Sequence, residues 1–385
     1  MKLIKEKKIP RIVLPKDKPE ITPEDEARFA AITNIELTAD QQRRITEPDQ
    51  RYPRQKSVLA VHWHPEFLDM DLIRQRVENL YPQAIEKLII PTQHNRISAY
   101  DDYCGVEVDC YSRGFQRKVQ LLIHFHRDHL EKTGVLQGAL EHTFQYRASQ
   151  LFNLLRALSK PDQQRLDKAA RETGAEESTI ELVRLQAAKL EALLERNYDT
   201  LPPDVIKNRL SRLFLETLRG EGYENKTINK AQVFLRQVKQ DIKASFPLDF
   251  FYRTSEIIEE ARSIGAGIVI PHPEEFWPIL LAEYDVDGYE VWNPQSLEYT
   301  EFLISVLSEK NRRRAQGERQ LLVFMGDDTH FSEKIKEYEN QDKSKRGREI
   351  GYQPPWDDLS LRKKLIVAGM DRETVIHEYK SRLDA

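Results

Sequence analysis

Two histidines stand two residues apart in His62-Trp63-His64, directly after the apolar run 58–61. On an extended strand, side chains two residues apart point to the same face, so both imidazoles can reach one metal ion. A single pair of this kind at a strand end is more often packing than ligation. The prediction of a metal site therefore depends on whether apolar runs elsewhere in the chain also end in metal-binding residues.

The same arrangement recurs along the chain. Glu107 lies inside the alternating segment 104–108, and Asp328 stands two residues before the last histidine of an apolar run. Seven of the ten histidines lie at such strand ends: His62, His64, His94, His124, His126, His272 and His330. Histidines scattered through a core would not be distributed in this way, so we predict that most of them bind metal.

The candidate ligands are imidazoles and carboxylates, with no thiolate among them. This set of ligands suits Zn, Mn or Fe. Cys104 and Cys110 flank Glu107, and we expect them to serve packing. Because the candidates outnumber the ligands that one ion takes, two or three divalent ions are implied, with Glu107 suited to bridging. Closely spaced ions activate water and neutralise phosphoryl oxygens during an in-line displacement.

The composition is that of a soluble globular protein. The chain has 385 residues, a mean hydropathy of -0.64 and 39% hydrophobic residues. Its net charge of -4 gives no global attraction to nucleic acid, so such binding would need a local basic patch. Two cysteines exclude a disulfide framework, and the sequence contains neither an apolar signal segment near Met1 nor a membrane span, so we expect a cytoplasmic protein.

Five segments are expected. Runs of four to six apolar residues bounded by polar loops are typical of buried parallel strands, whose carboxyl ends converge on one face of a barrel. Helical periodicity dominates the middle of the chain, and a helix is predicted after the capping residue Thr22. The segments are an N-terminal extension (1–55), the first barrel part (56–130), a helical insertion (131–249), the second barrel part (250–335) and a C-terminal helical tail (336–385).

Within the insertion, Pro and Gly mark where helices stop. The polar stretch 160–177 is either mobile or a further helix. The expected helices are 130–158, one that includes residues 180–194, 205–218 and 228–242.

The site motifs occur in a fixed order: His-x-His at 62–64, an apolar run to His94, Gly-Val-Glu ending at Glu107, an apolar run to His126, Ile-Pro-His-Pro around His272, Gly-Tyr-Glu-Val-Trp-Asn at 288–293, and Gly-Asp-Asp-Thr-His ending at His330. This ordered set resembles the PHP superfamily, named for polymerase and histidinol phosphatase. The resemblance covers residues 56–130 and 250–330. It implies an α/β fold with a distorted seven-stranded (β/α)7 TIM-like barrel, and a trinuclear metal site that hydrolyses phosphoesters.

The resemblance also implies which residues hold each ion. One ion would be held by His62, His64, Glu107 and Asp328, a second by Glu107, His126 and His272, and part of a third by His94 and His330. The family usually adds a ligand shortly after the first pair. Asp69 fits by spacing, with Glu66 and Asp71 as alternatives, and Gln93 stands where the family commonly has Asp.

Further residues are candidates for contact with substrate. His124 and His126 share a strand face; we prefer His126 as the ligand and leave His124 as a supporting or substrate-facing group. Arg96 and Arg127 follow His94 and His126 and are the best-placed phosphate clamps, although arginines in such loops are usually solvated. We expect Glu290 to support the barrel or a neighbouring loop. The basic clusters 312–314 and 343–348 lack interleaved aromatics and are expected to be solvated.

These observations predict a metal-dependent phosphoesterase that hydrolyses a phosphomonoester or phosphodiester by attack of metal-bound hydroxide. An amidohydrolase is a rival, but it would call for a carbamylated lysine or its equivalent and an eighth strand. The second rival is a non-catalytic PHP-like binding or assembly module. A phosphorylated small molecule or nucleotide is the expected substrate, nucleic acid is an alternative, no membrane partner is expected, and the insertion could join copies of the chain.

Overall fold

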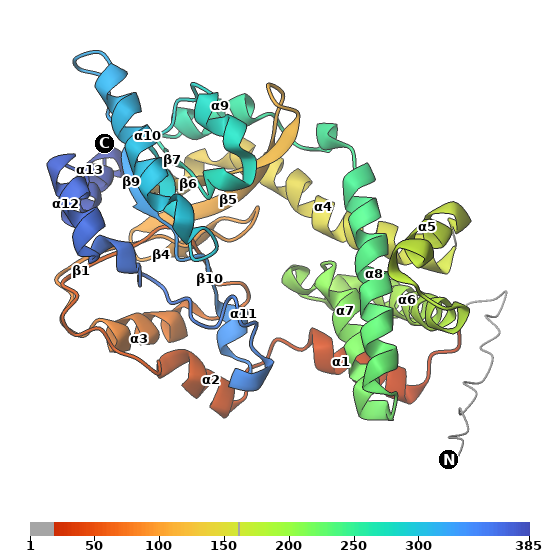
Figure 1. The fold of residues 1–385 in the computed structure, drawn as a ribbon. Helices are drawn as coiled ribbons and strands as arrows, with labels where there is room; N and C mark the ends of the chain where they lie inside the picture. The colour runs from red at the N-terminus through yellow and green to blue at the C-terminus, as the bar shows by residue number, and fades with distance from the viewer. Residues whose placement is uncertain (1–18, 161) are drawn as a thin grey trace, which may run out of the picture. The chain divides into compact units, whose positions relative to one another are not determined.

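The computed structural model describes residues 19–160 and 162–385, which form two compact units (Figure 1). A helical unit contains residues 19–36 and 145–247, and a mixed α/β unit contains 37–144 and 248–385. The mixed α/β class agrees with the sequence prediction. The first 18 residues of the expected N-terminal extension lie outside the described residues.

The helical unit is built on amphipathic helices whose apolar faces meet in one core. Thr22 caps the first helix as expected, since its side chain accepts a hydrogen bond from the backbone N–H of Asp25. The polar stretch after residue 160 forms a helix that ends at Gly174, which has a φ of 66°. The helices are α1 (Pro23–Thr33), most of α4 (Gly134–Ser159), α5 (Gln163–Thr173), α6 (Glu177–Asn197), α7 (Arg209–Glu216) and α8 (Asn225–Ser245).

The strands of the mixed unit form one six-stranded sheet and two strand pairs. The sheet has the order β4-β5-β6-β7-β8-β9, and the pairs are β1 with β3 and β2 with β10. The strands are β1 (Ser57–Ala60), β2 (Trp63–His64), β3 (Glu86–Ile89), β4 (Ser98–Tyr100), β5 (Tyr103–Ser112), β6 (Arg117–His126), β7 (Gly267–Ile270), β8 (Gly288–Trp292), β9 (Leu322–Met325) and β10 (Thr329–His330).

Strand direction differs from the all-parallel arrangement that we expected. β5 and β6 form a long antiparallel hairpin, and β6 is also antiparallel to β7, whereas β7, β8 and β9 are parallel. The carboxyl end of β6 therefore lies beside the amino end of β7. Among the described residues the ladders do not close, so the seven-stranded barrel is not confirmed.

The strand groups are joined at several places, and two of these involve predicted metal ligands. An isolated parallel bridge joins His94 to Glu107, and the N–H of Asn95 donates to the Glu107 carbonyl over 2.7 Å. At the other place, the N–H of Asp328 donates to the His62 carbonyl over 2.9 Å, next to the pairing of β2 with β10. At these two places, candidate ligands or their immediate neighbours take part in joining the groups.

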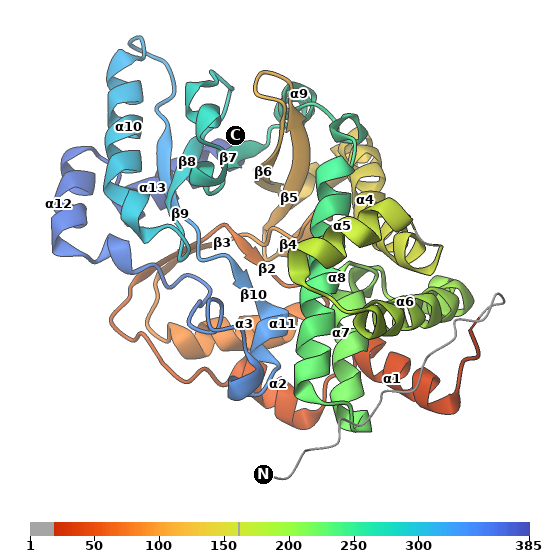
Figure 2. The same ribbon diagram turned by 45° about the vertical axis from the view of Figure 1, so that its right-hand side comes forward.

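Helices cover the strands and supply the remaining core (Figure 2). α13 packs on β1, β3, β6, β7 and β9, and α10 packs on β8 and β9. In the segment 336–385, which belongs to the mixed unit, the structure has α12 and α13. The helices are α2 (Ala39–Thr46), α3 (Met70–Leu80), α9 (Thr254–Ser263), α10 (Thr300–Arg313), α11 (Phe331–Lys334), α12 (Leu359–Val367) and α13 (Arg372–Leu383). In the part of the chain that the structure describes, no helix combines the length and apolarity that crossing a membrane requires.

Candidate metal centre

His62 lies two residues after β1 and His64 lies in β2, and both are buried. β1 alternates between two cores: Leu59 packs into the main core of the sheet, and Val58 packs against the core under α3. This alternation fixes the strand register, so the two histidines emerge on the same side with ring centroids 5.4 Å apart.

Seven of the nine predicted ligands converge around this pair. Within each of three groups, the candidate ligand atoms lie within 4.8 Å of one another. Two ligand atoms on opposite sides of one zinc-sized ion would be about 4.2 Å apart. Small side-chain movements would therefore allow the atoms of each group to coordinate one ion. The groups are His64, His94 and His330; His62, Glu107 and His272; and His62, His64 and Asp328.

Several buried polar atoms of the centre have no hydrogen-bond partner. These include Nδ1 of His64 and Nδ1 of His272, while Nε2 of His64 and Oε2 of Glu107 have only ion-pair contacts, with Asp328 and His94. A buried polar atom without a partner is costly, and several of them in one place are rare in a folded protein. Because all of them are donors that divalent ions accept as ligands, the residues fit a metal centre.

The charge state of His64 also suits ligation. Burial lowers its pKa well below the usual value of 6.5, and the neighbouring His94 and His330 lower it further. Its ring stacks between theirs, with centroid distances of 4.3 Å to each. A neutral imidazole offers a lone pair to a metal, whereas a protonated one does not.

The two carboxylate oxygens of Asp328 have different surroundings. Oδ1 lies 3.2 Å from Nε2 of His64 and 3.3 Å from Nε2 of His330. Oδ2 accepts hydrogen bonds from Arg348 and, over 3.2 Å, from Gln295. Although burial opposes ionisation, His330 and His64 keep the Asp328 pKa well below its usual value. Oδ1 is thus the oxygen left for an ion.

Glu290, which we expected to support the barrel or a neighbouring loop, contacts two histidines of the centre. Its Oε1 is 2.6 Å from Nδ1 of His62, and its Oε2 accepts the backbone N–H of His272 over 3.0 Å. Burial disfavours a charged His62, but the Glu290 carboxylate overrides burial and raises the His62 pKa to about 10. The raised pKa favours a protonated His62 in the metal-free chain, so a metal at Nε2 would displace that proton. A carboxylate on one ring nitrogen is the usual device for orienting the other nitrogen toward a metal.

Backbone strain gathers at the same place. Six non-glycine residues among those described have positive φ, and four of them belong to the centre or adjoin it. Such conformations persist only where surrounding contacts enforce them, and they cluster at functional sites. The four are Glu66 (57°), Asn95 (51°), His272 (28°) and Asp328 (47°).

Of the three alternatives for the ligand after the first pair, the structure brings Glu66 close. Its Oε1 is 4.0 Å from Nδ1 of His330, and its Oε2 accepts the N–H of Ser332 over 2.6 Å. Asp69 is exposed and caps α3 by accepting the N–H of Asp71 over 2.8 Å. The assignment of Asp69 as a ligand is therefore not supported, because its carboxylate serves the helix end.

His126 does not join the centre either. It pairs with Tyr103 at the carboxyl end of β6, and its Nδ1 is 3.4 Å from the Asp128 carboxylate. Because β6 is antiparallel to β7, this end lies beside the amino end of β7, whereas His272 follows the carboxyl end of β7. The structure therefore does not bring His126, which we preferred to His124 as a ligand because it follows an aromatic residue at the strand end, into any of the three donor groups.

The three predicted substrate contacts have different surroundings. His124 is buried with both ring nitrogens satisfied, by the Val61 carbonyl at 3.0 Å and the Tyr379 hydroxyl at 2.8 Å. Burial lowers its pKa to about 3, so it is a neutral packing residue. Arg127 is exposed beside the Cys104 thiol, on the His126 side. Arg96 is exposed after the His94 bridge.

Arg348 was missed by sequence reasoning, since it lies in a charged stretch that we expected to be solvated. Its side chain is buried and contacts both the carboxylate and the carbonyl of Asp328, the latter over 3.1 Å. Its Nη2 is buried with no hydrogen-bond partner. Nearby, Asp327 accepts the N–H of Gly351 over 3.0 Å, which ties the same segment to the centre. No periodicity distinguishes Arg348 from its neighbours in the sequence.

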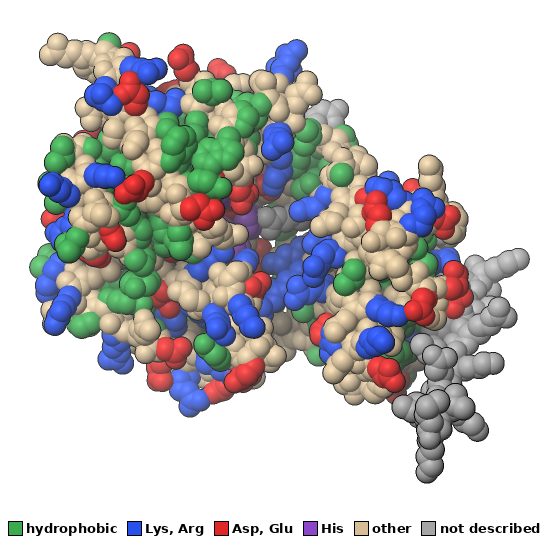
Figure 3. Space-filling view, in the orientation of Figure 1, with side chains coloured by type: hydrophobic (Ala, Val, Ile, Leu, Met, Phe, Trp, Pro, Cys, Tyr) green, Lys and Arg blue, Asp and Glu red, His purple; other side chains and the backbone are tan. Residues whose placement is uncertain are grey.

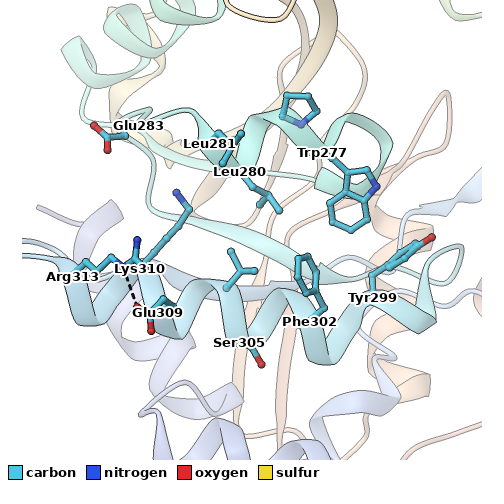
Figure 4. A pocket seen from close by; sticks show the side chains of 12 residues that line it. Trp277, Leu280, Leu281, Glu283, Tyr299, Phe302, Ser305, Glu309, Lys310 and Arg313 are labelled. Carbon is cyan, nitrogen blue, oxygen red and sulfur yellow. Dashed lines mark hydrogen bonds and ion pairs between the residues drawn. The ribbon is translucent and has the colours of Figure 1, made fainter.

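A separate pocket lies between the segment after His272 and α10 (Figure 4). Its volume is about 1100 Å³, and its walls are mainly apolar, with Trp277, Tyr299 and Phe302 at one end. None of the residues that line it belongs to the three donor groups. The pocket is therefore not the place where the buried donors gather.

Comparison with known proteins gives only distant likenesses, all of them to solved structures. No family model and no curated protein matches the chain. A solved structure of a proposed metal-dependent phosphoesterase from Bifidobacterium adolescentis ATCC 15703 aligns with a TM-score of 0.45 and 15% identity, covering 82% of this chain and 97% of that one. A likeness at this level assigns no activity to this chain.

Proposed function

We propose that the protein is a metal-dependent hydrolase of phosphoric esters, with the donors around His62 and His64 as its active site. The observation that carries the proposal is the gathering of buried imidazole and carboxylate atoms without hydrogen-bond partners into three overlapping groups. His62 and His64 each belong to two groups, so the proposed ions are close neighbours. We propose two to three ions of Mn, Fe or Zn in a centre of the PHP type, on a distorted barrel.

The proposed roles follow from the surroundings of each side chain. When bound, such ions activate water and neutralise charge on the phosphoryl group. Glu290 holds His62, and Arg348 holds Oδ2 of Asp328, so both ligands are oriented by groups that do not themselves ligate. The buried Nη2 of Arg348 retains donor capacity beside Asp328 and is our candidate for contacting an anionic substrate oxygen.

The donor set also separates the proposal from its rivals. The carboxylate of Glu107 lies among the imidazoles of these groups, whereas the amidohydrolase reading would call for a carbamylated lysine in such a place. A non-catalytic binding module could have lost its ligands, yet seven of the predicted ligands converge here. The phosphoesterase is thus the reading that these residues support best.

The test combines metal content with activity. We would purify the chain without chelator, measure Mn, Fe and Zn by elemental mass spectrometry, and assay a phosphomonoester and a phosphodiester with p-nitrophenyl leaving groups. We expect two to three ions per chain and metal-dependent hydrolysis, both lost in His64→Ala. Bound metal without hydrolysis of either ester would contradict the activity, and no metal even after addition would contradict the centre as well.

A further inference from the structure

A row of cations runs along one face of α8. Arg236, Lys239 and Lys243 are three and four residues apart, so they lie on the same side of the helix. Gln232, one turn earlier on this face, donates from Nε2 to the Arg212 carbonyl over 3.0 Å, which places α7 and Arg212 beside the row. Figure 3 shows Lys and Arg side chains gathered over the region of α7.

These cations differ from others in the helical unit, because most of them lack an acidic partner. Lys230 pairs with Glu176, and Arg219 pairs with Glu216. Within 19–160 and 162–385, by contrast, no carboxylate forms an ion pair with Arg212, Arg236 or Lys239. Charges that repel one another and have no internal counterion are available to an external anion.

The electrostatics of Lys239 agree with this geometry. The side chain is half-buried, and burial lowers its pKa from the ordinary value. Lys243, Arg212 and Arg236 lower the pKa further, because each adds positive charge near the ammonium group. The row therefore behaves as a concentrated local positive field on a chain whose net charge is -4.

We propose that this row, formed by Arg212, Arg236, Lys239 and Lys243, binds the sugar-phosphate backbone of a nucleic-acid strand. The α8 part spans about 10 Å at 1.5 Å per residue, a length that covers about three phosphates of one strand. An elongated row matches a repeating anion better than a single phosphate group. The proposal concerns binding by the helical unit and does not depend on the activity of the metal centre.

A membrane surface matches this row of cations less well than a nucleic-acid strand does. Helices that bind at a bilayer interface insert an apolar face beside their cations. The apolar face of α8 is already used, since Phe234, Leu235 and Val238 are buried in the core of the helical unit. Anionic lipid is therefore kept as a competing outcome of the test.

The experiment measures binding of the full-length chain to a fluorescently labelled 20-nucleotide single strand by anisotropy between 50 and 300 mM KCl. Strand length is checked on a denaturing gel, so that binding and cleavage are read separately. The variant is Arg212→Gln/Arg236→Gln/Lys239→Gln. The control, Arg312→Gln/Arg313→Gln/Lys364→Gln, removes the same charge from residues that are paired with Glu309 and Glu301.

We expect the wild-type affinity to fall with salt and the variant to lose at least tenfold at 100 mM KCl. The slope of log affinity against log salt should lose about 2 units in the variant, since each phosphate contact with a single strand contributes about 0.7. The control should bind like wild type. Absence of binding at 50 mM KCl, an equal loss in the control, or stronger binding to phosphatidylserine vesicles than to the strand would overturn the proposal.

Misfolding would not imitate the expected result. Because the three substituted cations repel one another and hold no carboxylate, their removal should leave the thermal midpoint unchanged or slightly higher. A variant with lower affinity and an undiminished midpoint has lost the surface rather than the fold.

Discussion

A methyl group added to Gly326 would stand 2.1 Å from Oε1 of Glu290, because the backbone of Gly326 lies directly against that carboxylate. Glu290 cannot easily move away, since it contacts the His62 ring and accepts the His272 N–H. The glycine just after β9 thus leaves the space in which the supporting carboxylate of the metal centre lies.

Gly326→Ala should therefore weaken metal binding. Displacing Glu290 frees the His62 ring to rotate, and loss of such a supporting group typically reduces metal affinity by about 10- to 100-fold. Titration of the metal-free chain with Mn or Zn by calorimetry would measure the change. Gly138→Ala is the control, because a methyl there meets nothing within 4 Å. Equal affinity in Gly326→Ala and wild type would show that Glu290 does not need its observed position.

Two histidine variants should separate ligands from bystanders. His64→Ala removes a ring that takes part in two of the three donor groups, so we expect it to abolish metal retention and hydrolysis. His126→Ala changes a partly exposed ring outside all three groups, and we expect metal content within experimental error of wild type. Elemental analysis of both proteins after identical purification checks this. Loss of metal from His126→Ala would restore our original assignment.

Arg348→Gln should affect the metal-free protein more than the metal-loaded one. Without the guanidinium, the buried Asp328 carboxylate loses its charged partner, and breaking a buried ion pair costs about 3–5 kcal/mol. A bound ion would neutralise the same carboxylate and recover part of that loss. Urea unfolding with and without metal measures both states. If Arg348→Gln loses the same unfolding free energy with and without metal, Arg348 and the ion do not both neutralise Asp328.

Acid stability should depend on Glu349. Burial would raise its pKa, but the charges of Arg76 and Lys334 lower it from 4.5 to about 2. A carboxylate with a depressed pKa in the fold stabilises it above the pKa of the unfolded chain, and this contribution is lost as pH falls through the lower value. The relevant window is therefore about pH 4.5 to 2.

Glu349→Gln should consequently be much less stable than wild type at pH 7, because it leaves Arg76 buried without the carboxylate that it contacts over 2.5 Å. The difference should narrow as pH falls toward 2, since the wild-type carboxylate then takes up its proton. Urea midpoints at pH 7, 4 and 2.5 would follow this. Glu339→Gln, on an exposed carboxylate, is the control. If the difference in urea midpoint between wild type and Glu349→Gln does not change with pH, the lowered pKa of Glu349 is contradicted.

Much of the centre was predictable because its residues occupy strand ends. The apolar alternation before His62 fixes the side to which both histidines point, and the same logic places His272 after β7. His94 and Asp328 follow from the same pattern. An apolar run in the sequence indicates a buried strand. The polar residues that directly follow such a run are therefore expected at the end of that strand.

Strand direction was not predictable in the same way. An apolar run has the same appearance whether its strand is parallel or antiparallel, so nothing in 117–126 indicated that β6 runs against β7. That reversal sends His126 to the other end of the sheet. Arg348 was missed for another reason: its burial depends on contacts with Asp328 that are set by the path of a loop rather than by local periodicity.

The pairing of His62 with Glu290 joins positions 228 residues apart in the sequence, with the helical unit's longest segment between them. During synthesis at about 5–20 residues per second, the carboxylate would be made roughly 10 to 45 s after the histidine. For that interval the nascent chain carries His62 and His64 without their supporting group. The three donor groups can therefore be completed only after His330 has been made, so ion loading follows synthesis of the whole helical unit.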